Sequence, residues 1–514
     1  MKKYSTLLKD SMTALAAGLL IGAVVGLFSL DNFLMGWWQA GLYSALLVFG
    51  LIRVWRLAGS GRTLAILMIV TFGLRLVLGI FLYQGLPAFG FDTPVQQAGY
   101  VFSDAYERDQ AAYQISVSGQ NWLPQFVEQR AVDQYGGLLA LSTLIYRLFS
   151  SDAHRPLLLV MLSASAMSAG AGFLFAAVQR KWGEKVARAT LWVFALYPEG
   201  VLLGSSQMRE PLLIGLAALL FWLSLNWKEK PFRTLVAMGL TTLAACLISI
   251  PGGAVTLLVV GGLVYLEWFS FQQNRTLRRV SIIFFISALG LATAGGWYWL
   301  KEGLYYEFYT TTLGSGMIQV LFEGLPQSLR NIAITLYGFS QPLLPAALVD
   351  PSKAIWQGIA IFRAAGWYFV LPFLVYTFFR VFYAQEKDHK SLLVFLSLIF
   401  AVWVVVSSLR AGGDQWDNPR YRATLLPWMS ILVGWTWAQL SSNRNLWFWF
   451  IVSMESLFVL LLTGFYLNRF VNLKAVQSLK LTMMLFGGIA LLIVIVFLIL
   501  NKKSRQKPAL TKKP

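Results

Sequence analysis

Apolar residues in this chain occur in long blocks, and the length of the blocks restricts what the chain can fold into. Each block runs for roughly 17–24 residues, the length that an α-helix needs to cross ~30 Å of hydrocarbon. Of the 514 residues, 57% are hydrophobic and 13% are charged, whereas soluble domains carry about 25% charged residues. A single soluble core cannot absorb so much apolar sequence, so we expect an all-α polytopic membrane protein.

The blocks predict about fourteen membrane-spanning helices. Their ranges are 11–30, 36–54, 63–83, 156–178, 186–204, 210–226, 233–250, 252–270, 280–300, 356–379, 391–409, 423–440, 446–466 and 481–500. The predicted organisation is a two-helix extension (1–62), a membrane module (63–300) with an external loop (84–155), a second external loop (301–355), C-terminal membrane helices (356–500) and a basic tail (501–514). The apolar segment 136–149 is too short to span, so we expect an amphipathic helix at the membrane interface.

The net charge of +19 is spread over short segments between the apolar blocks, such as RKWGEK (180–185) and NRTLRR (274–279). No basic face interleaved with aromatic residues is evident, so nucleic acid is not an expected partner. If successive spans cross the membrane in opposite directions, starting from a cytoplasmic N-terminus, most basic residues become cytoplasmic, as the positive-inside rule requires. We call this arrangement the alternating threading. We therefore expect a bacterial inner-membrane protein whose two termini are cytoplasmic and whose two large loops are external.

Cysteine and histidine are scarce, which limits the kinds of metal site that the chain can build. Cys246 is the single cysteine and lies in an apolar block, and the two histidines, His154 and His389, are far apart. Disulfides and thiolate sites are excluded, and a histidine-built site is not expected. No cofactor is indicated; if a metal takes part, Mg²⁺ or Mn²⁺ on carboxylates is favoured over Zn²⁺.

The first external loop contains a cluster of acids in SDAYERD (103–109). Asp104 and Glu107 have the spacing of a capping box, in which they would merely begin a helix. Alternatively, a carboxylate at the top of a membrane span deprotonates an acceptor hydroxyl or holds a divalent cation. On this second interpretation Asp104 and Glu107 are catalytic, and Tyr106 and Asp109 bind substrate.

Three further groups of polar residues stand beside apolar blocks. Arg75 lies inside the span 63–83, where it either faces the protein interior or extends to the outer interface. Glu210 heads a span directly after Arg209; it stabilises the helix start or completes a polar cluster with Asp104. In NPRYR (418–422), Arg420 and Arg422 flank Tyr421, and paired guanidinium donors suit phosphate oxygens, although the three residues would also suit interface anchoring.

The order of these features resembles the GT-C superfamily of membrane glycosyltransferases, in the branch of protein O-mannosyltransferases and lipid A aminoarabinose transferases. The resemblance covers about residues 63–230, and a second, shorter stretch of resemblance is NPRYRATLLPW (418–428). It is carried by LRLVLGIF (74–81), SDAYERDQAAYQIS (103–116), YGGLLALSTLIYRLFSSDAHRPL (135–157), KWGEKVARATLWVFALYPEG (181–200) and SSQMREPLLIGLAALLFWL (205–223). The chain departs from the family in its two preceding spans and in having Asp104-Ala105 where some members have Asp-Glu.

The resemblance implies transfer of a sugar from a polyprenyl-phosphate carrier to an acceptor glycan, lipid or protein on the external face. It implies that Asp104 is the first-loop catalytic acid and that Glu210 is the acid heading the next external hairpin. Arg75, Arg209, Arg420, Tyr421 and Arg422 are the further candidates for substrate binding. Two other functions stay open: a flippase or transporter of lipid-linked sugars, and an O-antigen polymerase or ligase.

Overall fold

The computed structural model describes residues 2–28, 32–119, 133, 135–226, 231–269, 325–384, 387–412, 414–441, 445–471 and 479–506, with isolated residues between 275 and 301. Regular structure in these ranges is helical throughout. The chain divides into two compact units. The first is Met1–Tyr306 with Arg420–Gly434, and the second is Glu307–Pro419 with Trp435–Pro514.

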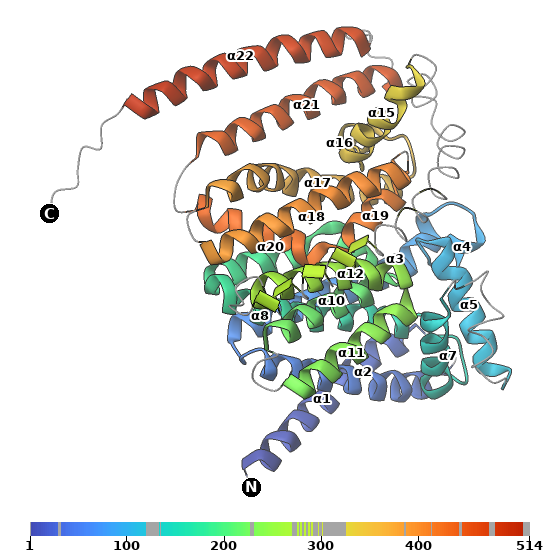
Figure 1. Cartoon of the computed structure of the whole chain (residues 1–514). Coiled ribbons are helices and arrows are strands. Elements are labelled where there is room, and N and C mark those ends of the chain that lie inside the picture. The colour runs from blue at the N-terminus through green and yellow to red at the C-terminus, as the bar shows by residue number, and fades with distance from the viewer. Residues whose placement is uncertain are drawn as a thin grey trace. The chain divides into compact units, whose positions relative to one another are not determined.

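The first unit contains the helices that carry the candidate site (Figure 1). They are α1 (Lys2–Gly26), α2 (Phe33–Leu57), α3 (Arg62–Phe89), α4 (Pro94–Gln97), α5 (Ser103–Val117), α7 (Gly137–Phe149), α8 (Leu157–Leu196), α9 (Pro198–Gly204), α10 (Glu210–Asn226), α11 (Pro231–Ile248), α12 (Ile250–Val264) and a π-helical turn (Tyr265–Phe269). The unit also takes the end of α19 (Asp417–Ala423) and the start of α20 (Leu426–Leu440).

The second unit has two short helices followed by long apolar ones. They are α15 (Gln327–Ser340), α16 (Leu344–Val349), α17 (Ala354–Arg380), a 3₁₀ turn (Val381–Tyr383), α18 (Lys387–Ala411), α21 (Leu446–Val471) and α22 (Leu479–Gln506). Helices α15 and α16 lie within the range 301–355, where the sequence predicts the second external loop; the external position of this segment stays a prediction. The remainder of that loop, 302–324, lies outside the described residues, as does 507–514 of the tail.

Ten described helices are long and apolar enough to cross a membrane, which confirms a multi-pass membrane protein. The predicted number of about fourteen stays a prediction. The predicted span 156–178 corresponds to the first part of α8, and the predicted span 186–204 covers the end of α8 and α9. Within α8 the helix is interrupted at Gly183 with φ +81°, a backbone conformation that glycine adopts readily. The predicted span 280–300 lies outside the described residues except at isolated positions. Residues 137–149 form a separate short apolar helix, as expected.

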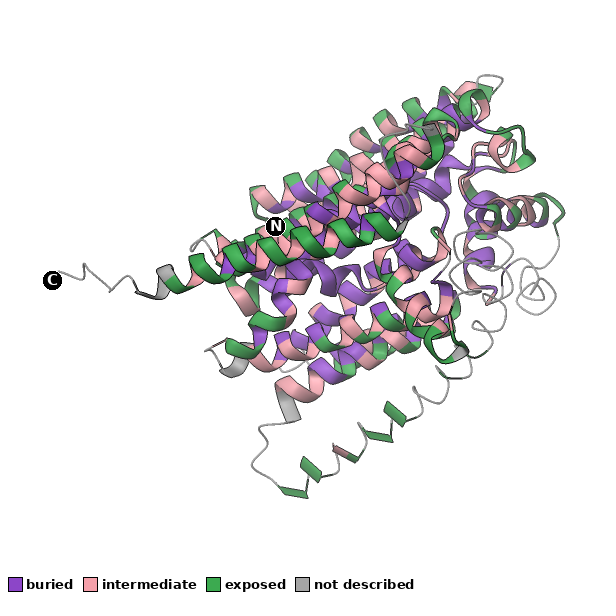
Figure 2. Cartoon of the chain, turned by 90° about the horizontal axis from the view of Figure 1, so that it is seen from above, coloured by how far each residue is buried: buried purple, intermediate pink, exposed green. Residues whose placement is uncertain are grey.

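Burial differs sharply between the apolar helices. In α8, 83% of the most apolar stretch is buried, whereas in the stretch of α22 from Lys480 to Lys502 the share is 6%. Figure 2 shows the helix that leads to the C-terminus mostly exposed, with intermediate residues between the exposed ones. An apolar helix with so little protein cover is stable only when lipid surrounds it, so the exposure supports membrane insertion of α22.

Polar contacts join helix ends that the alternating threading assigns to the same side of the membrane. Arg180 donates to Asn226 Oδ1 at 2.5 Å, and Lys181 pairs with Glu267. All four residues belong to ends predicted to be cytoplasmic. Because an error of one span between these residues would separate the ends by the thickness of the bilayer, their contact supports the predicted alternation of spans between residues 180 and 267. The absolute orientation stays a prediction.

Helices α1 and α2 cross at glycine. A Cβ atom at Gly22 would collide with the backbone of Gly41, and one at Gly18 would collide with Ala45. Gly18 and Gly22 are four residues apart and therefore lie on one face of α1, the arrangement that lets membrane helices approach closely.

We expect Gly22→Ile to separate α1 from α2 and to lower stability by about 1–3 kcal/mol, as overpacking does. The measurement is the midpoint of thermal unfolding in detergent, followed by the intrinsic fluorescence of the tryptophans. Gly50→Ile is the matched control, because Gly50 lies in α2 and has no heavy atom within 4 Å of an added Cβ. Equal midpoints for the two variants would contradict the close crossing.

Candidate functional site

Arg75 is fully buried in α3, so the interpretation that it extends to the outer interface is wrong. Its guanidinium donates to the carbonyl oxygens of Thr71 at 2.9 Å, Ala195 at 3.1 Å and Phe194 at 3.2 Å. The last two carbonyls belong to the final turn of α8, whose partial negative charge a cation stabilises. A Cβ at Gly204 would lie 2.6 Å from Arg75 Cδ, so α9 packs directly on the side chain. Arg75 thus joins α3, α8 and α9 inside the protein.

The helix α5 carries Asp104 near its first turn, but the capping box predicted from Asp104 and Glu107 does not form. The N-cap is Phe102, and no side chain caps this helix. Phe102 is buried, and its carbonyl accepts from Tyr106 N at 3.2 Å, so the helix begins two residues earlier than a cap at Asp104 would allow. As a result, the Asp104 carboxylate is available for other contacts.

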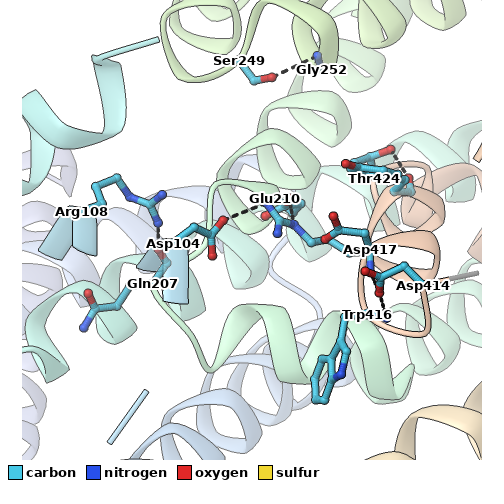
Figure 3. A network of polar contacts seen from close by, with 12 residues as sticks. Asp104, Arg108, Gln207, Glu210, Ser249, Gly252, Asp414, Trp416, Asp417 and Thr424 are labelled. Carbon is cyan, nitrogen blue, oxygen red and sulfur yellow. Dashed lines mark hydrogen bonds and ion pairs between the residues drawn. The ribbon is translucent and has the colours of Figure 1, made fainter. Parts of the chain in front are cut away.

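Arg420 joins Asp104 to Glu210. Its Nε donates to Glu210 Oε1 at 2.6 Å, and one terminal nitrogen donates to Asp104 Oδ2 at 3.1 Å (Figure 3). The Glu210 side chain is 5% exposed and the Asp104 side chain is 36% exposed. The prediction that Glu210 completes a polar cluster with Asp104 is therefore confirmed, and Arg420 is the residue that connects them. We call these three residues the acid–arginine cluster.

Two more arginines lie close to the acid–arginine cluster. Burial by itself would raise the pKa of Asp104, but the positive charges of Arg420, Arg108 and Arg209 outweigh it, so the pKa lies below its usual value of 3.8. Asp104 is therefore a carboxylate across the neutral range. Arg108 is four residues after Asp104 on α5, and a spacing of four places side chains on one helix face.

Two buried atoms beside Asp104 have no hydrogen-bond partner among the described residues: Nη1 of Arg108 and Oε2 of Glu210. Arg108 is 2% exposed, and its other terminal nitrogen donates to the carbonyl of Gln207. Burial lowers the pKa of Arg108, and the negative charges of Asp104 and Glu210 oppose that shift. Leaving a buried donor and a buried acceptor unsatisfied is costly, and a ligand that accepts from Arg108 and donates to Glu210 would satisfy both.

The other candidates from the sequence take different positions. Glu107 is exposed, and Tyr106 packs edge-on against Tyr100 with 5.3 Å between ring centroids. The Arg209 guanidinium lies over the ring of Tyr135, 5.4 Å from its centroid. Tyr421 is half-buried and Arg422 is 1% exposed, so Arg422 lies in the interior. Asp109 belongs to a separate cluster with Tyr100, Tyr146 and His154.

A partly open cavity lies beside the start of α5. Its walls come from α3, the loop before α5, the start of α8 and the turn between α9 and α10, and include Tyr83, Tyr100, Phe102, Ala105, Pro156 and Gln207. Phe102 and Ala105 flank Asp104 in sequence, but Asp104 is not among the lining residues. Its carboxylate meets Arg420 instead.

The acid–arginine cluster does not have the composition of a metal site. The described residues contain no group of three or more His, Cys, Asp or Glu that could hold a metal ion. A divalent cation shared by Asp104 and Glu210 would have to displace Arg420, whose charge already serves both carboxylates. The expectation of Mg²⁺ or Mn²⁺ therefore stays a prediction, without support from this geometry.

Several residues of the site were not among the sequence candidates, above all Arg108, Tyr100 and Gln207. The spacing of four between Asp104 and Arg108 could have revealed Arg108, because it predicts a shared helix face. Gln207 contributes mainly through its backbone carbonyl and its place in a turn, and no pattern of residue types signals such a contribution.

The low pKa of Asp104 predicts how the stability of the protein depends on pH. A carboxylate whose pKa is lower in the folded state contributes stability above its unfolded pKa and loses it as the pH falls through the folded value. We therefore expect Asp104→Asn to lower the unfolding midpoint equally at pH 5 and pH 8. The difference should shrink only below the usual pKa of 3.8. A difference that vanishes between pH 8 and pH 5 would contradict the contact with Arg420.

Comparison with known proteins gives no match: no protein-family model matches this chain, and no curated protein is similar enough in sequence to match it. The resemblance to GT-C glycosyltransferases therefore rests on the order of motifs described above. The function has to be argued from the acid–arginine cluster and its surroundings.

Proposed function

We propose that this protein is a membrane glycosyltransferase that moves a sugar from a polyprenyl-phosphate carrier to an acceptor on the external face of the membrane. The observation that carries the proposal is the acid–arginine cluster, in which Asp104 is ionised, partly exposed and held by Arg420. Its three members come from α5, α10 and α19, at chain ends that the alternating threading places on the external side. A carboxylate at that level can meet a lipid head group without leaving the membrane surface.

Asp104 acts as the general base in this proposal. Its carboxylate takes the proton of the acceptor hydroxyl while the hydroxyl oxygen bonds to the anomeric carbon of the sugar. The bond between that carbon and the phosphate oxygen breaks, and the polyprenyl phosphate leaves with the electron pair. Arg420 orients the carboxylate and keeps it ionised. Because the carrier phosphate is a good leaving group, the reaction needs no nucleotide.

The donor phosphate is assigned to Arg108 and Arg209. The sequence favoured Arg420 and Arg422, but Arg420 donates to two carboxylates and Arg422 is in the interior. Nη1 of Arg108 is buried and has no hydrogen-bond partner in the part of the chain that the structure describes, and Arg209 is half-buried next to Glu210 in sequence. Positive charge at the phosphate stabilises the negative charge that develops as the carbon–oxygen bond breaks. The unsatisfied Oε2 of Glu210 accepts from a hydroxyl group of the sugar.

The proposal is tested by following the carrier lipid. The purified protein is placed in lipid vesicles with undecaprenyl phosphate carrying glucose, mannose, galactose or aminoarabinose, together with a membrane extract as the acceptor source. Free undecaprenyl phosphate is measured by mass spectrometry. Release that depends on the extract and on Asp104 supports transfer. Movement of the labelled donor between leaflets without release would instead identify a flippase.

We expect Arg209→Ala to weaken the use of the donor. Loss of one charge-assisted hydrogen bond costs about 1.5–3 kcal/mol, so KM for the undecaprenyl-phosphate sugar should rise about 10- to 100-fold, with a smaller change in kcat. The control is Arg62→Ala, since Arg62 is exposed at the start of α3. An unchanged KM in the Arg209 variant would remove Arg209 from the phosphate site.

A further inference from the structure

Asp109 lies at the centre of a second polar cluster, on the same helix as Asp104. It is 1% exposed, and its carboxylate accepts hydrogen bonds from the hydroxyl groups of Tyr100 and Tyr146. The Nε2 atom of His154 lies 2.8 Å from Asp109 Oδ2. We call Asp109 and these three partners the Asp109 cluster. Both oxygens of the carboxylate are used by the protein itself, which argues against the direct substrate contact that the sequence suggested.

The partners of Asp109 come from three separate segments. Tyr100 belongs to the loop before α5, Tyr146 to α7, and His154 to the segment that leads into α8. Burial, with the charge of Asp109 as a further cause, raises the pKa of Tyr100 and Tyr146 well above the usual value of 10.0. Both hydroxyl groups therefore stay protonated and keep donating. The Asp109 cluster thus holds α5 against α7 and against the start of α8.

The residues that follow His154 extend this connection to the rest of the first unit. Arg155 is buried; it pairs with Asp152 at 2.7 Å and donates to Gln39 Oε1 of α2 at 2.9 Å. The carbonyl of Pro156 accepts from Gln207 Nε2 at 3.0 Å. Segment 154–156 is therefore tied to α5, to α2 and to the turn before α10 at once.

The position of Asp109 on α5 determines what this connection does to Asp104. The two residues are five apart, so they differ by about 140° around a helix of 3.6 residues per turn. Asp104 faces Arg420 while Asp109 faces α7 and segment 154–156. Contacts on the second face fix the rotation of α5 about its axis, and that rotation decides whether Asp104 reaches Arg420.

We propose that Asp109 and His154 are positioning residues that hold α5 in the rotation at which Asp104 meets Arg420. The proposal rests on the proposed function for its effect on catalysis, although its structural effect does not. Loss of the Asp109 cluster allows α5 to turn, and Asp104 then separates from Arg420. Helix α2 takes part, because its Gln39 helps to hold segment 154–156.

The test measures the accessibility of Asp104 directly. In Asp109→Asn, labelling of Asp104 by a water-soluble carbodiimide and an amine, read by peptide mass spectrometry, should rise several-fold at pH 6. Labelling of Asp92 is the internal control, because Asp92 is exposed in the same loop. Equal labelling of Asp104 in wild type and in a folded Asp109→Asn protein would overturn the proposal. This readout does not depend on any activity, so it is separable from a failure of the proposed function.

Milder variants keep the test decisive where Asp109→Asn does not fold. Tyr146→Phe and His154→Gln each alter one partner of Asp109 while retaining most of the side-chain volume. Each should raise the labelling of Asp104 and lower kcat more than it raises KM, since the donor site itself is intact. Tyr113→Phe is the matched control: Tyr113 stacks on His154 at 4.5 Å between ring centroids, and its substitution leaves the bonds to Asp109 in place. The same effect in the control as in Tyr146→Phe would contradict a role for the hydrogen bonds.

Discussion

Asp104→Asn should abolish sugar transfer while leaving the protein folded. The asparagine side chain has nearly the same shape and still accepts a hydrogen bond from Arg420, but it cannot take a proton from the acceptor. General base catalysis contributes about 10²–10⁴-fold to rates of this kind, and kcat should fall by that factor. The measurement is the release of undecaprenyl phosphate from the sugar-loaded carrier in vesicles.

The matched control for Asp104→Asn is Asp92→Asn, which neutralises an exposed acid on the same loop. It should retain wild-type turnover. Glu107→Gln separates the two acids of the predicted pair: Glu107 is exposed, so we expect at most a small effect. If Asp104→Asn turns over like the wild type, Asp104 is not the base.

Arg420→Ala should have the largest effect on stability. Substitution leaves Glu210, which is 5% exposed, without its ion-pair partner, and removing one partner of a buried pair costs about 3–5 kcal/mol. Asp104 is partly exposed, so the loss of its contact with Arg420 lowers stability less. The unfolding midpoint in detergent should drop well below the wild-type value, and transfer should be lost because Asp104 is no longer oriented.

A second substitution distinguishes the loss of the ion pair from a general disturbance. In Arg420→Ala with Glu210→Gln, the buried negative charge is gone, so much of the lost stability should return although transfer does not. The two single substitutions and the double one form a cycle that isolates the coupling between Arg420 and Glu210. Additive effects in that cycle would show that the contact contributes little.

The membrane fold follows from the sequence because block length is a strong constraint. Polar residues at the ends of apolar blocks are expected at the same level of the membrane, and so a polar cluster with Asp104 was one of the two interpretations of Glu210, although the two residues are far apart in the chain. The sequence did not indicate which of Arg420 and Arg422 contacts Asp104. Residues two apart on a helix point about 200° away from each other, so one meets Asp104 and the other is buried. The rotation of α19 about its axis determines which of the two arginines meets Asp104.

The Asp109 cluster shows why the remaining contacts of the site could not be predicted from the sequence. The motif SDAYERD and the family resemblance assign Asp104 to catalysis and Asp109 to substrate binding, but nothing in the motif indicates that Asp109 is held inside the protein. The distinction arises from Tyr100, Tyr146 and His154, which lie in three different segments. The helix start depends likewise on the burial of Phe102, which tertiary packing determines and local capping preference does not.

The position of a bound carrier lipid tests the central claim most directly. Cryo-electron microscopy of Asp104→Asn with an undecaprenyl-phosphate sugar should show the phosphate within hydrogen-bond distance of Arg108 and Arg209. The sugar should lie beside residue 104 and within hydrogen-bond distance of Glu210 Oε2. A carrier lipid bound at another place, with the acid–arginine cluster unchanged and empty of ligand, would contradict the proposed transferase site.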